Sequence, residues 1–294
     1  MFDYKRIFKN RELRLRLINC LRFIPSGPYL KMVFYIKTGK HLNLKSPVTF
    51  CDKQNWLKLN DIHPEYTELV DKTKVAAYIY QKTGKYMTFP ILGIWNSYDE
   101  IDFDSLPERF VLKCNHDSGS VKVIHDKNKI DHKIMKAFYD SRMRINTYVL
   151  GREYPYKNVK PLIFAEKYMT PVGCDDIEDY KFFCFNGKPT IMFVATDRSS
   201  DCKFDFYDMD FNHLDIENIH PQSGRIIEKP ACFEEMKRIA SLLSQGMRFV
   251  RIDLYEIEGK IYFGEFTFFH GGGFWPLSPD KWEYDLGALL DIEN

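Results

Sequence analysis

The stretch 249–267, FVRIDLYEIEGKIYFGEFT, carries the residues whose types and spacing are best suited to chemistry. Side chains two residues apart on a strand share a face, so Arg251 and Asp253 lie on one face of the first strand predicted here. A turn around Gly259 leads into a second strand, which can place Glu265 opposite Asp253. Two carboxylates on one face, with an arginine beside them, suit a Mg²⁺ ion that bridges to a triphosphate.

The same residues also fit a simpler role. Arg251 can pair with the two carboxylates in a surface salt bridge that only holds the hairpin together. The aliphatic neighbours Val250, Ile252 and Leu254 face the other way, so the charged face need not be buried. On this interpretation Asp253 is an exposed strand carboxylate that contributes little to packing.

A lysine and a small polar turn form a second candidate site in the stretch 110–121, FVLKCNHDSGSV. Lys113 lies at the end of a predicted strand, and Ser118, Gly119 and Ser120 form the turn. Backbone N–H groups in such a turn can hold phosphate oxygens, and the lysine adds a positive charge. A strand follows the turn, whereas a helix follows the glycines of a P-loop. Ser-Gly-Ser is also a common hairpin turn, so this pattern alone does not establish a phosphate site.

A third candidate is the stretch 164–169, FAEKYM, which combines a strand with alternating charge. Its edge can present backbone N–H and C=O groups to an adenine ring. The simpler interpretation is an exposed edge strand whose charges prevent pairing with other chains. Taken alone, the pattern favours that second interpretation.

Three consecutive glycines follow the strand pair, in the stretch 270–274, HGGGF. Glycines allow a backbone to approach a ligand closely and to adopt positive φ angles. The alternative is a flexible turn that ends the sheet.

The elements that must position these residues are mostly predicted strands. Helical patterns cover 62–84, 131–148 and 232–245. In the first of these, Pro64 lies near the start of one helix and Asp71 is expected to be the N-cap of the next. A mixture of hairpins and a few helices predicts an α+β architecture. The predicted strands are 87–95, 110–113, 121–124, 161–167, 180–186, 190–196, 203–208, 248–254 and 260–268.

Charge is distributed unevenly along a chain of 294 residues with 42 basic and 41 acidic side chains. The net charge of +1 argues against a general nucleic-acid binder. Residues 1–45 nevertheless hold eleven Lys or Arg and only two acidic residues. Apolar residues recur there at helical spacing, namely Leu13, Leu17, Leu21 and Ile24. A basic amphipathic helix of this kind can lie on an anionic membrane or bind an anionic polymer; the simpler alternative is a helical arm with a solvated face.

Seven cysteines and eight histidines are scattered along the chain without metal-site spacing. The cysteines are odd in number and form no C-x-x-C pair, so we expect reduced, mostly buried thiols. No apolar run approaches the length of a membrane span. Charged residues stand where a signal peptide would need its apolar stretch, which predicts a cytoplasmic protein.

Taken together, these elements resemble the ATP-grasp enzymes in order and spacing. The chain is most similar to the TupA-like branch, which is associated with bacterial polysaccharide and teichuronopeptide biosynthesis. The resemblance covers residues 42–290. It rests on the stretches 44–50, 70–75, 109–116, 150–154, 179–188 and 249–255, of which the last three are specific as a set.

The resemblance implies a role for each candidate residue. Lys72 resembles the first nucleotide-binding lysine, with Lys74 as a competitor, and Lys113 resembles the second, which contacts phosphates. Arg251 resembles the arginine that stabilises the reaction centre. The remaining assignments are Ser118, Gly119 and Ser120 in the phosphate-covering loop; Glu166, Lys167 and Met169 in the adenine hinge; Asp179 at the ribose and Lys181 near the phosphates; Asp253, Glu265 and Thr267 at the metal; and Arg198, His270, Gly271 and Gly272 at the substrate.

Three departures from the family pattern affect these assignments. The nucleotide-covering loop is less glycine-rich than usual. Many ATP-grasp ligases have an asparagine where this chain has Thr267, which is a weaker metal ligand. The region that normally precedes the ATP-grasp unit is also short and largely helical here. Since the acceptor site usually borrows from that region, the identity of the substrate does not carry over.

The resemblance further implies an α+β ATP-grasp fold in which two α+β subdomains clasp the nucleotide, after a helical N-terminal extension. The corresponding division is 1–62, 63–165 and 166–294. The implied activity is ATP- and Mg²⁺-dependent ligation of a carboxylate to an amine through an acylphosphate. The carboxylate would belong to a uronic-acid sugar or polysaccharide precursor and the amine to an amino acid. Residues 1–45 would touch an anionic polymer or the inner membrane face, and no nucleic acid is expected.

Two rival functions remain at this point. A glycosyltransferase would use Mg²⁺ with a D-x-D motif, and Asp208-Met209-Asp210 has that spelling. It lies in an aromatic hairpin rather than after a parallel strand, so a turn is the favoured interpretation. A non-catalytic scaffold is disfavoured because Lys113 and Arg251 occur together with the two predicted metal carboxylates.

Overall fold

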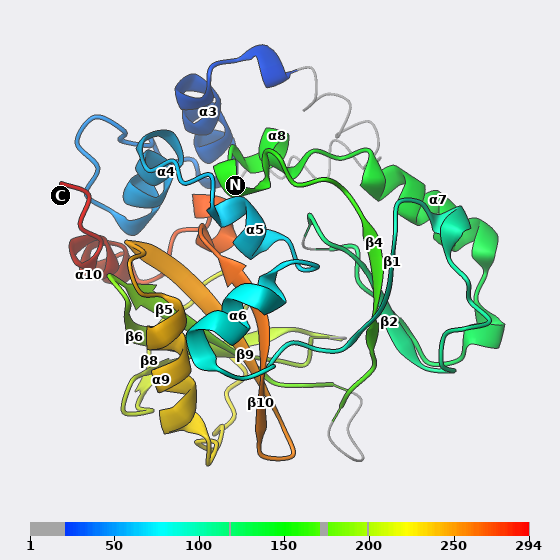
Figure 1. Cartoon of the computed structure of the whole chain (residues 1–294). Coiled ribbons are helices and arrows are strands. Elements are labelled where there is room, and N and C mark those ends of the chain that lie inside the picture. Colours follow the sequence, from blue (N-terminus) through cyan, green and yellow to red (C-terminus); the bar gives the residue numbers. More distant parts are fainter. Residues whose placement is uncertain (1–20, 118, 171–175, 199, 294) are drawn as a thin grey trace.

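The computed structural model describes residues 21–293, apart from 118, 171–175 and 199 (Figure 1). Most of the predicted basic helix therefore lies outside the described residues. Its last residues form a single 3₁₀ turn, η1 (Leu21–Phe23), and helix α3 (Ser26–Thr38) begins directly after Pro25. No helix among the described residues has both the length and the apolar character needed to cross a membrane.

Two antiparallel sheets organise the chain. The smaller sheet has the strand order β1-β4-β2-β3 and packs against helix α7 (His132–Met143), at the right of Figure 1. Tyr139 of this helix is fully buried and donates a hydrogen bond to the Leu112 carbonyl (2.8 Å). The strands of this sheet are β1 (Ile91–Trp95), β2 (Phe110–Cys114), β3 (Lys122–Ile124) and β4 (Ile163–Lys167).

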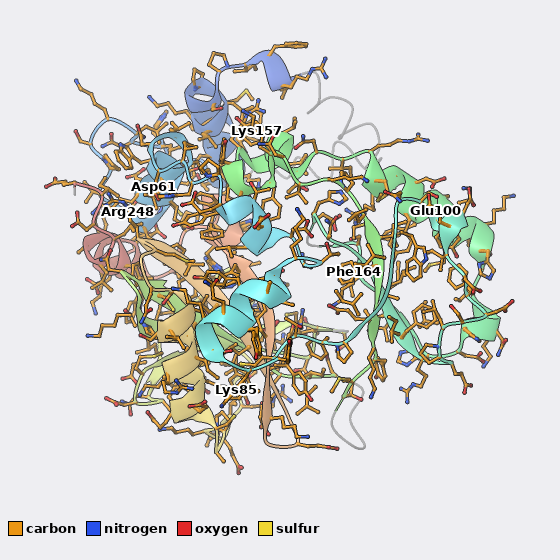
Figure 2. All side chains as sticks on the ribbon, in the orientation of Figure 1. Asp61, Lys85, Glu100, Lys157, Phe164 and Arg248 are labelled. Carbon is orange, nitrogen blue, oxygen red and sulfur yellow. The ribbon has the colours of Figure 1, made fainter. Side chains whose placement is uncertain are left out.

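Strand β4 pairs with β1 on one side and with β2 on the other. The interpretation of 164–169 as an exposed edge strand is therefore wrong. The edge of β4 predicted to be free is paired with β1, which lies about 70 residues earlier in the chain, so the local sequence around β4 does not reveal this partner. Phe164, labelled in Figure 2, is fully buried in β4. The predicted boundary between residues 165 and 166 falls inside this strand.

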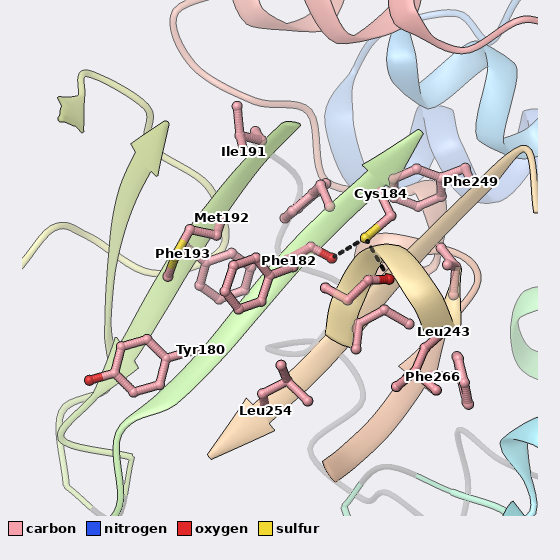
Figure 3. Packing of buried hydrophobic residues seen from close by; sticks show 14 of the residues in the cluster. Tyr180, Phe182, Cys184, Ile191, Met192, Phe193, Leu243, Phe249, Leu254 and Phe266 are labelled. Atoms are coloured by element: carbon pink, nitrogen blue, oxygen red, sulfur yellow. Dashed lines mark hydrogen bonds between the residues drawn. The ribbon is translucent and has the colours of Figure 1, made fainter. Parts of the chain in front are cut away.

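The larger sheet has the order β10-β9-β5-β6-β7-β8, and all its pairs are antiparallel. Its central strand, β5, is buried along its whole length. On one face Phe182 and Cys184 pack under helix α9 (Phe233–Leu243), and the Cys184 thiol donates to the Ala240 carbonyl (Figure 3). The strands are β5 (Asp179–Phe185), β6 (Lys188–Thr196), β7 (Lys203–Asp208), β8 (His213–Leu214), β9 (Phe249–Ile257) and β10 (Lys260–Thr267).

Short helices close the remaining faces. Helix α4 (Phe50–Asn60) begins with a capping box. The Thr49 hydroxyl accepts a hydrogen bond from the Asp52 N–H, and the Asp52 carboxylate accepts one from the Thr49 N–H. Its far end is tied to the start of β9, because Arg248 Nε donates to Asp61 Oδ1 (3.2 Å; Figure 2). The other short helices are α5 (Tyr66–Val70), α6 (Val75–Thr83), α8 (Thr147–Gly151) and α10 (Lys281–Leu289), and two 3₁₀ turns are η4 (Tyr154–Tyr156) and η5 (His270–Gly273).

Two predicted helical features differ from the structure. The helix expected over 131–148 is split, because the Asn146 side chain accepts from the Tyr148 N–H and starts α8 as a separate helix. Asp71 is not the N-cap of α6, which begins four residues later; its carboxylate instead accepts from the N–H and hydroxyl of Thr73.

The D-x-D spelling belongs to a tight turn between β7 and β8. Asp208 accepts hydrogen bonds from the N–H groups of Asp210 (2.9 Å) and Asn212 (2.8 Å) and from the Asn212 side chain. Because these contacts use both oxygens of the first aspartate, the turn interpretation is confirmed and no observation favours a glycosyltransferase metal site here.

Candidate functional site

A row of charged side chains crosses the larger sheet on the face opposite α9. Three neighbouring strands supply it, since Asp253 of β9 is the register partner of Lys181 on β5 and of Glu265 on β10. The predicted pairing of Asp253 with Glu265 is thus confirmed. The register shifts at Gly264, just before Glu265, and a side chain does not fit there because its Cβ would meet the Tyr255 ring at 2.7 Å.

This charged face is buried, contrary to expectation. Asp253 is 0% exposed and Arg251 and Lys181 are each 8% exposed. The aliphatic neighbours do face the other way, but η5 and the segment between α5 and α6 cover the charged side. Consequently Asp253 is not an exposed strand carboxylate, and its substitution would not leave packing untouched.

Asp253 is the most heavily bonded carboxylate of the site. Arg251 donates from Nε to Asp253 Oδ1 and from Nη2 to Oδ2, both at 2.7 Å. Lys181 donates to Oδ2 from the neighbouring strand. A buried carboxylate needs such opposite charges and donors, because desolvating it unpaired costs several kcal/mol.

Glu265 shares Arg251 with Asp253 at longer range and has Lys72 as a second cation. Its Oε1 lies 3.4 Å from Arg251 Nη2 and its Oε2 lies 3.6 Å from Lys72 Nζ. The Thr267 hydroxyl donates to Oε1 (3.3 Å), so the predicted third metal residue contacts the second. Burial alone would raise the pKa of Glu265, but the nearby positive charges, Lys72 foremost, outweigh burial and place its pKa below the ordinary value.

His270 lies behind Arg251 and is 2% exposed. Burial, together with the charges of Arg251 and Lys181, holds its pKa well below the ordinary value, so the ring is neutral. Since Arg251 Nη1 donates to Nδ1 (2.9 Å), the proton is on Nε2, which donates to Asn218 Oδ1 (2.8 Å). His270 therefore positions the guanidinium, and the substrate contact predicted for it stays a prediction.

The predicted phosphate turn is held by Arg142 of α7 and by hydrogen bonds of its own residues. Arg142 donates to Asp117 Oδ2 (3.2 Å) and to the Gly119 carbonyl (2.8 Å). The Ser120 hydroxyl accepts from the Cys114 N–H (3.0 Å) and donates to Asp117. Ser118 lies outside the described residues.

Lys72 links this turn to the charged row. Its Nζ donates to the Asp117 carbonyl (3.0 Å) on one side and faces Glu265 on the other. Lys74 points elsewhere and lies 3.9 Å from the exposed Glu68. Of the two competing lysines, only Lys72 is therefore within the charged site.

The predicted adenine hinge lies at the end of β4. Lys113 of β2 forms an ion pair with Glu166, and the Lys167 N–H donates to the Pro90 carbonyl (2.9 Å). Met169 is half-buried. The predicted second lysine and the first residues of the predicted hinge thus lie side by side on paired strands.

Asp179 extends the charged row along β5. It is fully buried, and its Oδ2 receives Lys181 Nζ (2.5 Å), Arg198 Nη1 (3.1 Å) and the Tyr255 hydroxyl (3.2 Å). Its Oδ1 has no hydrogen-bond partner in the part of the chain that the structure describes. The predicted ribose residue Asp179 thus contacts both the predicted substrate residue Arg198 and Lys181, which was predicted near the phosphates.

Some contributors to this arrangement were missed in the sequence. Strand alternation places Tyr255 on the face of Arg251 and Asp253, but no role was predicted for its hydroxyl. Asn218 and Arg142 had no local signal, because their partners are distant in the chain. A cavity of about 190 Å³ was also not predicted; its lining residues are His116, Met143, Arg144, Ile145, Asn146, Thr147, Tyr156, Val159 and Pro161.

Comparison of the chain with known proteins identifies its family. Residues 52–291 match the model of the TupA-like ATPgrasp family. No curated protein matches the chain.

Among solved structures, similar ones include D-alanine–D-alanine ligase from Bacillus anthracis complexed with ATP (17% identity, TM-score 0.39, 73% of this chain and 60% of that chain) and from Helicobacter pylori (15%, 0.38, 76% and 61%). Another is the ATP-grasp ligase PsnB complexed with minimal precursor, Mg and ADP (12%, 0.37, 74% and 57%). The chain spans about 60% of the length of these proteins.

The lowered pKa of Glu265 predicts a pH-dependent contribution to stability. The folded state favours the carboxylate form, so its contribution is complete above the ordinary value of 4.5 and is lost as the pH falls through the lower folded pKa. We expect Glu265→Gln to lower the free energy of unfolding by about 1–3 kcal/mol at pH 7. The difference from the wild type should shrink below pH 4.5. Urea unfolding at pH 7, 5 and 4 measures it.

The control for this series is Glu258→Gln, in the exposed turn between β9 and β10. The free energy of unfolding of this variant should equal that of the wild type at every pH. A Glu265→Gln deficit that stays constant down to pH 4 would show that the ion pairs of Glu265 contribute nothing to folding.

Proposed function

Because the chain belongs to the TupA-like ATP-grasp family, we propose that it is an ATP- and Mg²⁺-dependent ligase that joins a carboxylate to an amine. The observation that carries the proposal is the buried row in which Asp253 faces Glu265 between Lys72, Lys181 and Arg251. Transfer of a phosphoryl group depends on positioning and on neutralising negative charge, and this row supplies cations and carboxylates within a few ångströms of each other.

The two facing carboxylates fit the requirements of Mg²⁺. This ion takes one or two protein carboxylates and completes its octahedron with water and substrate phosphates. Within the described ranges, no group of three or more His, Cys, Asp or Glu side chains is placed to hold a metal. Asp253 and Glu265 would be the protein's share of the ligands, and the bound ion would neutralise phosphate charge; Thr267 supports Glu265 through its hydroxyl.

The surrounding cations would bind the nucleotide phosphates. Lys72, Lys181 and Arg251 now contact the carboxylates, and each has donors that a phosphate oxygen can accept in their place. Lys113 would add a further charge near the turn 118–120, and the hinge 166–169 would bind the adenine through its backbone. Asp179 belongs to the phosphate end of this arrangement, since it contacts Lys181 directly.

For the substrates, we propose a uronic-acid sugar or a polysaccharide precursor as the carboxylate and an amino acid as the amine. The support is the resemblance to a branch associated with polysaccharide biosynthesis, together with the basic composition of residues 1–45. That composition suits an anionic polymer or the inner membrane face. Gly271 and Gly272, which were predicted at the substrate, lie one and two residues after His270, and both have the positive φ that glycine adopts most readily.

Release of ADP tests the proposed ligation. Wild-type protein is mixed with Mg-ATP, with glucuronic or galacturonic acid, and with each of the twenty amino acids in turn. We expect ADP and phosphate to form in equal amounts, and only when a carboxylate and an amine are both present. The absence of ADP release in every mixture, or release that ignores both substrates, would overturn the proposal.

Replacement of Arg251 separates chemistry from folding. In Arg251→Lys the charge stays, but an ammonium cannot donate in parallel to both oxygens of Asp253 and also to His270. We expect turnover to fall about 100-fold or more, as after loss of an oxyanion donor, with little change in ATP affinity. Steady-state kinetics and a melting curve measure the two effects.

The matched control is Arg248→Lys, since Arg248 pairs with Asp61 at the end of α4. That variant should keep wild-type turnover. If Arg251→Lys melts earlier but turns over normally, Arg251 holds the hairpin and does not act in catalysis.

A further inference from the structure

The stretch 150–154, LGREY, contributes to the family resemblance, yet none of its residues has a role in the site described above. Helix α8 ends at Gly151, and Arg152 follows in the left-handed conformation (φ 56°). Arg152 is buried, donates to the Leu21 carbonyl (2.9 Å) and lies 4.2 Å over the ring of Tyr29. These contacts anchor the chain just before Glu153.

The Glu153 carboxylate lies in a notch between two glycines. A Cβ on Gly151 would be 2.5 Å from Glu153 Oε1, and a Cβ on Gly272 would be 3.4 Å from the same atom. Only glycine therefore leaves room at position 151 for this position of the carboxylate. Gly272 belongs to η5, the turn that also contains the Arg251 partner His270.

Glu153 is half-buried but unpaired. Among the described residues, none donates a hydrogen bond to its carboxylate and no cation lies within 4 Å of it; only burial and more distant charges act on it. Burial raises its pKa, as does the charge of Glu265, while Lys58 and Lys37 act in the opposite direction. A charged group left without a donor in such a position favours a ligand of opposite charge.

Lys58 is the cation that acts most strongly on Glu153, and its ammonium group already has other hydrogen-bond partners. Lys58 Nζ donates to the Gly272 carbonyl (2.5 Å) and to Asn55 Oδ1 (3.1 Å), and it lies 4.2 Å from the centre of the Phe274 ring. Burial lowers the pKa of Lys58 to about 7. Lys58 thus fixes the glycine turn, and it does not form an ion pair with Glu153.

Glu153 lies close to the reaction centre. The turn η5 connects them, because a Cβ on Gly272 would be 3.4 Å from Glu153 Oε1 and His270 of the same turn accepts a hydrogen bond from Arg251. Arg251 and Lys72 can attract a substrate carboxylate and would repel an ammonium group. Asp253 and Glu265 each have a cation within 4 Å, whereas Lys58 and Lys37 act on Glu153 only from a greater distance.

We propose that Glu153 binds the ammonium group of the amine substrate and accepts a proton from it. This inference rests on the proposed ligase function and assigns the amine half of it. An ammonium in the notch would fill the missing hydrogen bonds of the carboxylate, while the carboxylate substrate binds on the side of Arg251.

The proton balance of the step is complete. The bound ammonium, RNH₃⁺, gives one proton to the Glu153 carboxylate and becomes the free amine. The nitrogen then attacks the acyl carbon, the carbon–oxygen bond to the phosphoryl group breaks, and the electron pair leaves with phosphate. The second nitrogen proton goes to that phosphate, which departs as HPO₄²⁻, and the amide remains.

Hydroxylamine separates the two halves of the reaction. It is neutral near pH 7.5 and reacts with acylphosphates, so it needs neither an ammonium site nor a base. In Glu153→Gln we expect hydroxamate formation from glucuronic or galacturonic acid to stay within about 2-fold of the wild type. Amide formation with the best amino acid of the panel should fall about 100-fold, in the range for loss of a general base, with an increased KM for the amine.

Gly151→Ala provides a second variant that keeps the carboxylate. Its added Cβ collides with Glu153 Oε1 and so displaces the carboxylate without changing any charge. We expect the same selective loss of amide formation. The controls are Glu100→Gln, an exposed glutamate in η2 (Tyr98–Glu100; Figure 2), and Gly27→Ala, where the nearest atom to a Cβ is 3.9 Å away.

The possible outcomes are distinct. Normal amide formation by both variants, with normal KM for the amine, would overturn the role of Glu153 and leave the ligase proposal intact. An equal loss of hydroxamate and amide, or a lower melting temperature with normal kinetics of the folded fraction, would make Glu153 a structural counter-charge of Lys58 and would also overturn it. A wild type that forms neither product would overturn the ligase proposal itself.

Discussion

The bidentate pair between Arg251 and Asp253 is the interaction on which the site depends. Both side chains leave one face of β9 into a region that excludes water, and neither charge would be tolerated there alone. Removing one partner of a buried pair typically costs about 3–5 kcal/mol, because the other charge is left uncompensated. His270 and Lys181 complete the pair, so the neighbouring turn and strand are also positioned by it.

This constraint links the cations to the carboxylates. In the structure Lys72, Lys181 and Arg251 satisfy Asp253 and Glu265, so the site is close to neutral without a ligand. Triphosphate alone would compete with the carboxylates for the same donors, whereas a divalent ion would release those donors by binding the carboxylates itself. Binding of ATP and of Mg²⁺ should therefore be mutually dependent.

The sequence predicted the parts of the site that depend on strand alternation. Spacing along 249–267 was enough to place Asp253 opposite Glu265, because alternation and a hairpin are local properties. The burial of the charged face could not be predicted from this stretch alone, because the segments that cover the face, η5 and the segment near Lys72, lie outside it. The interior place of β4 and the notch around Glu153 likewise depend on residues far apart in the chain.

Thermal unfolding with ATP and Mg²⁺, separately and together, tests the central claim most directly. A ligand at about 100 times its Kd adds about 2.7 kcal/mol to the free energy of unfolding. We predict that millimolar Mg²⁺ alone, or ATP with excess EDTA, raises the melting temperature little, and that the two together raise it by more than the sum of the separate shifts. Equal shifts with and without Mg²⁺, or no shift at all in a folded sample, would contradict the account.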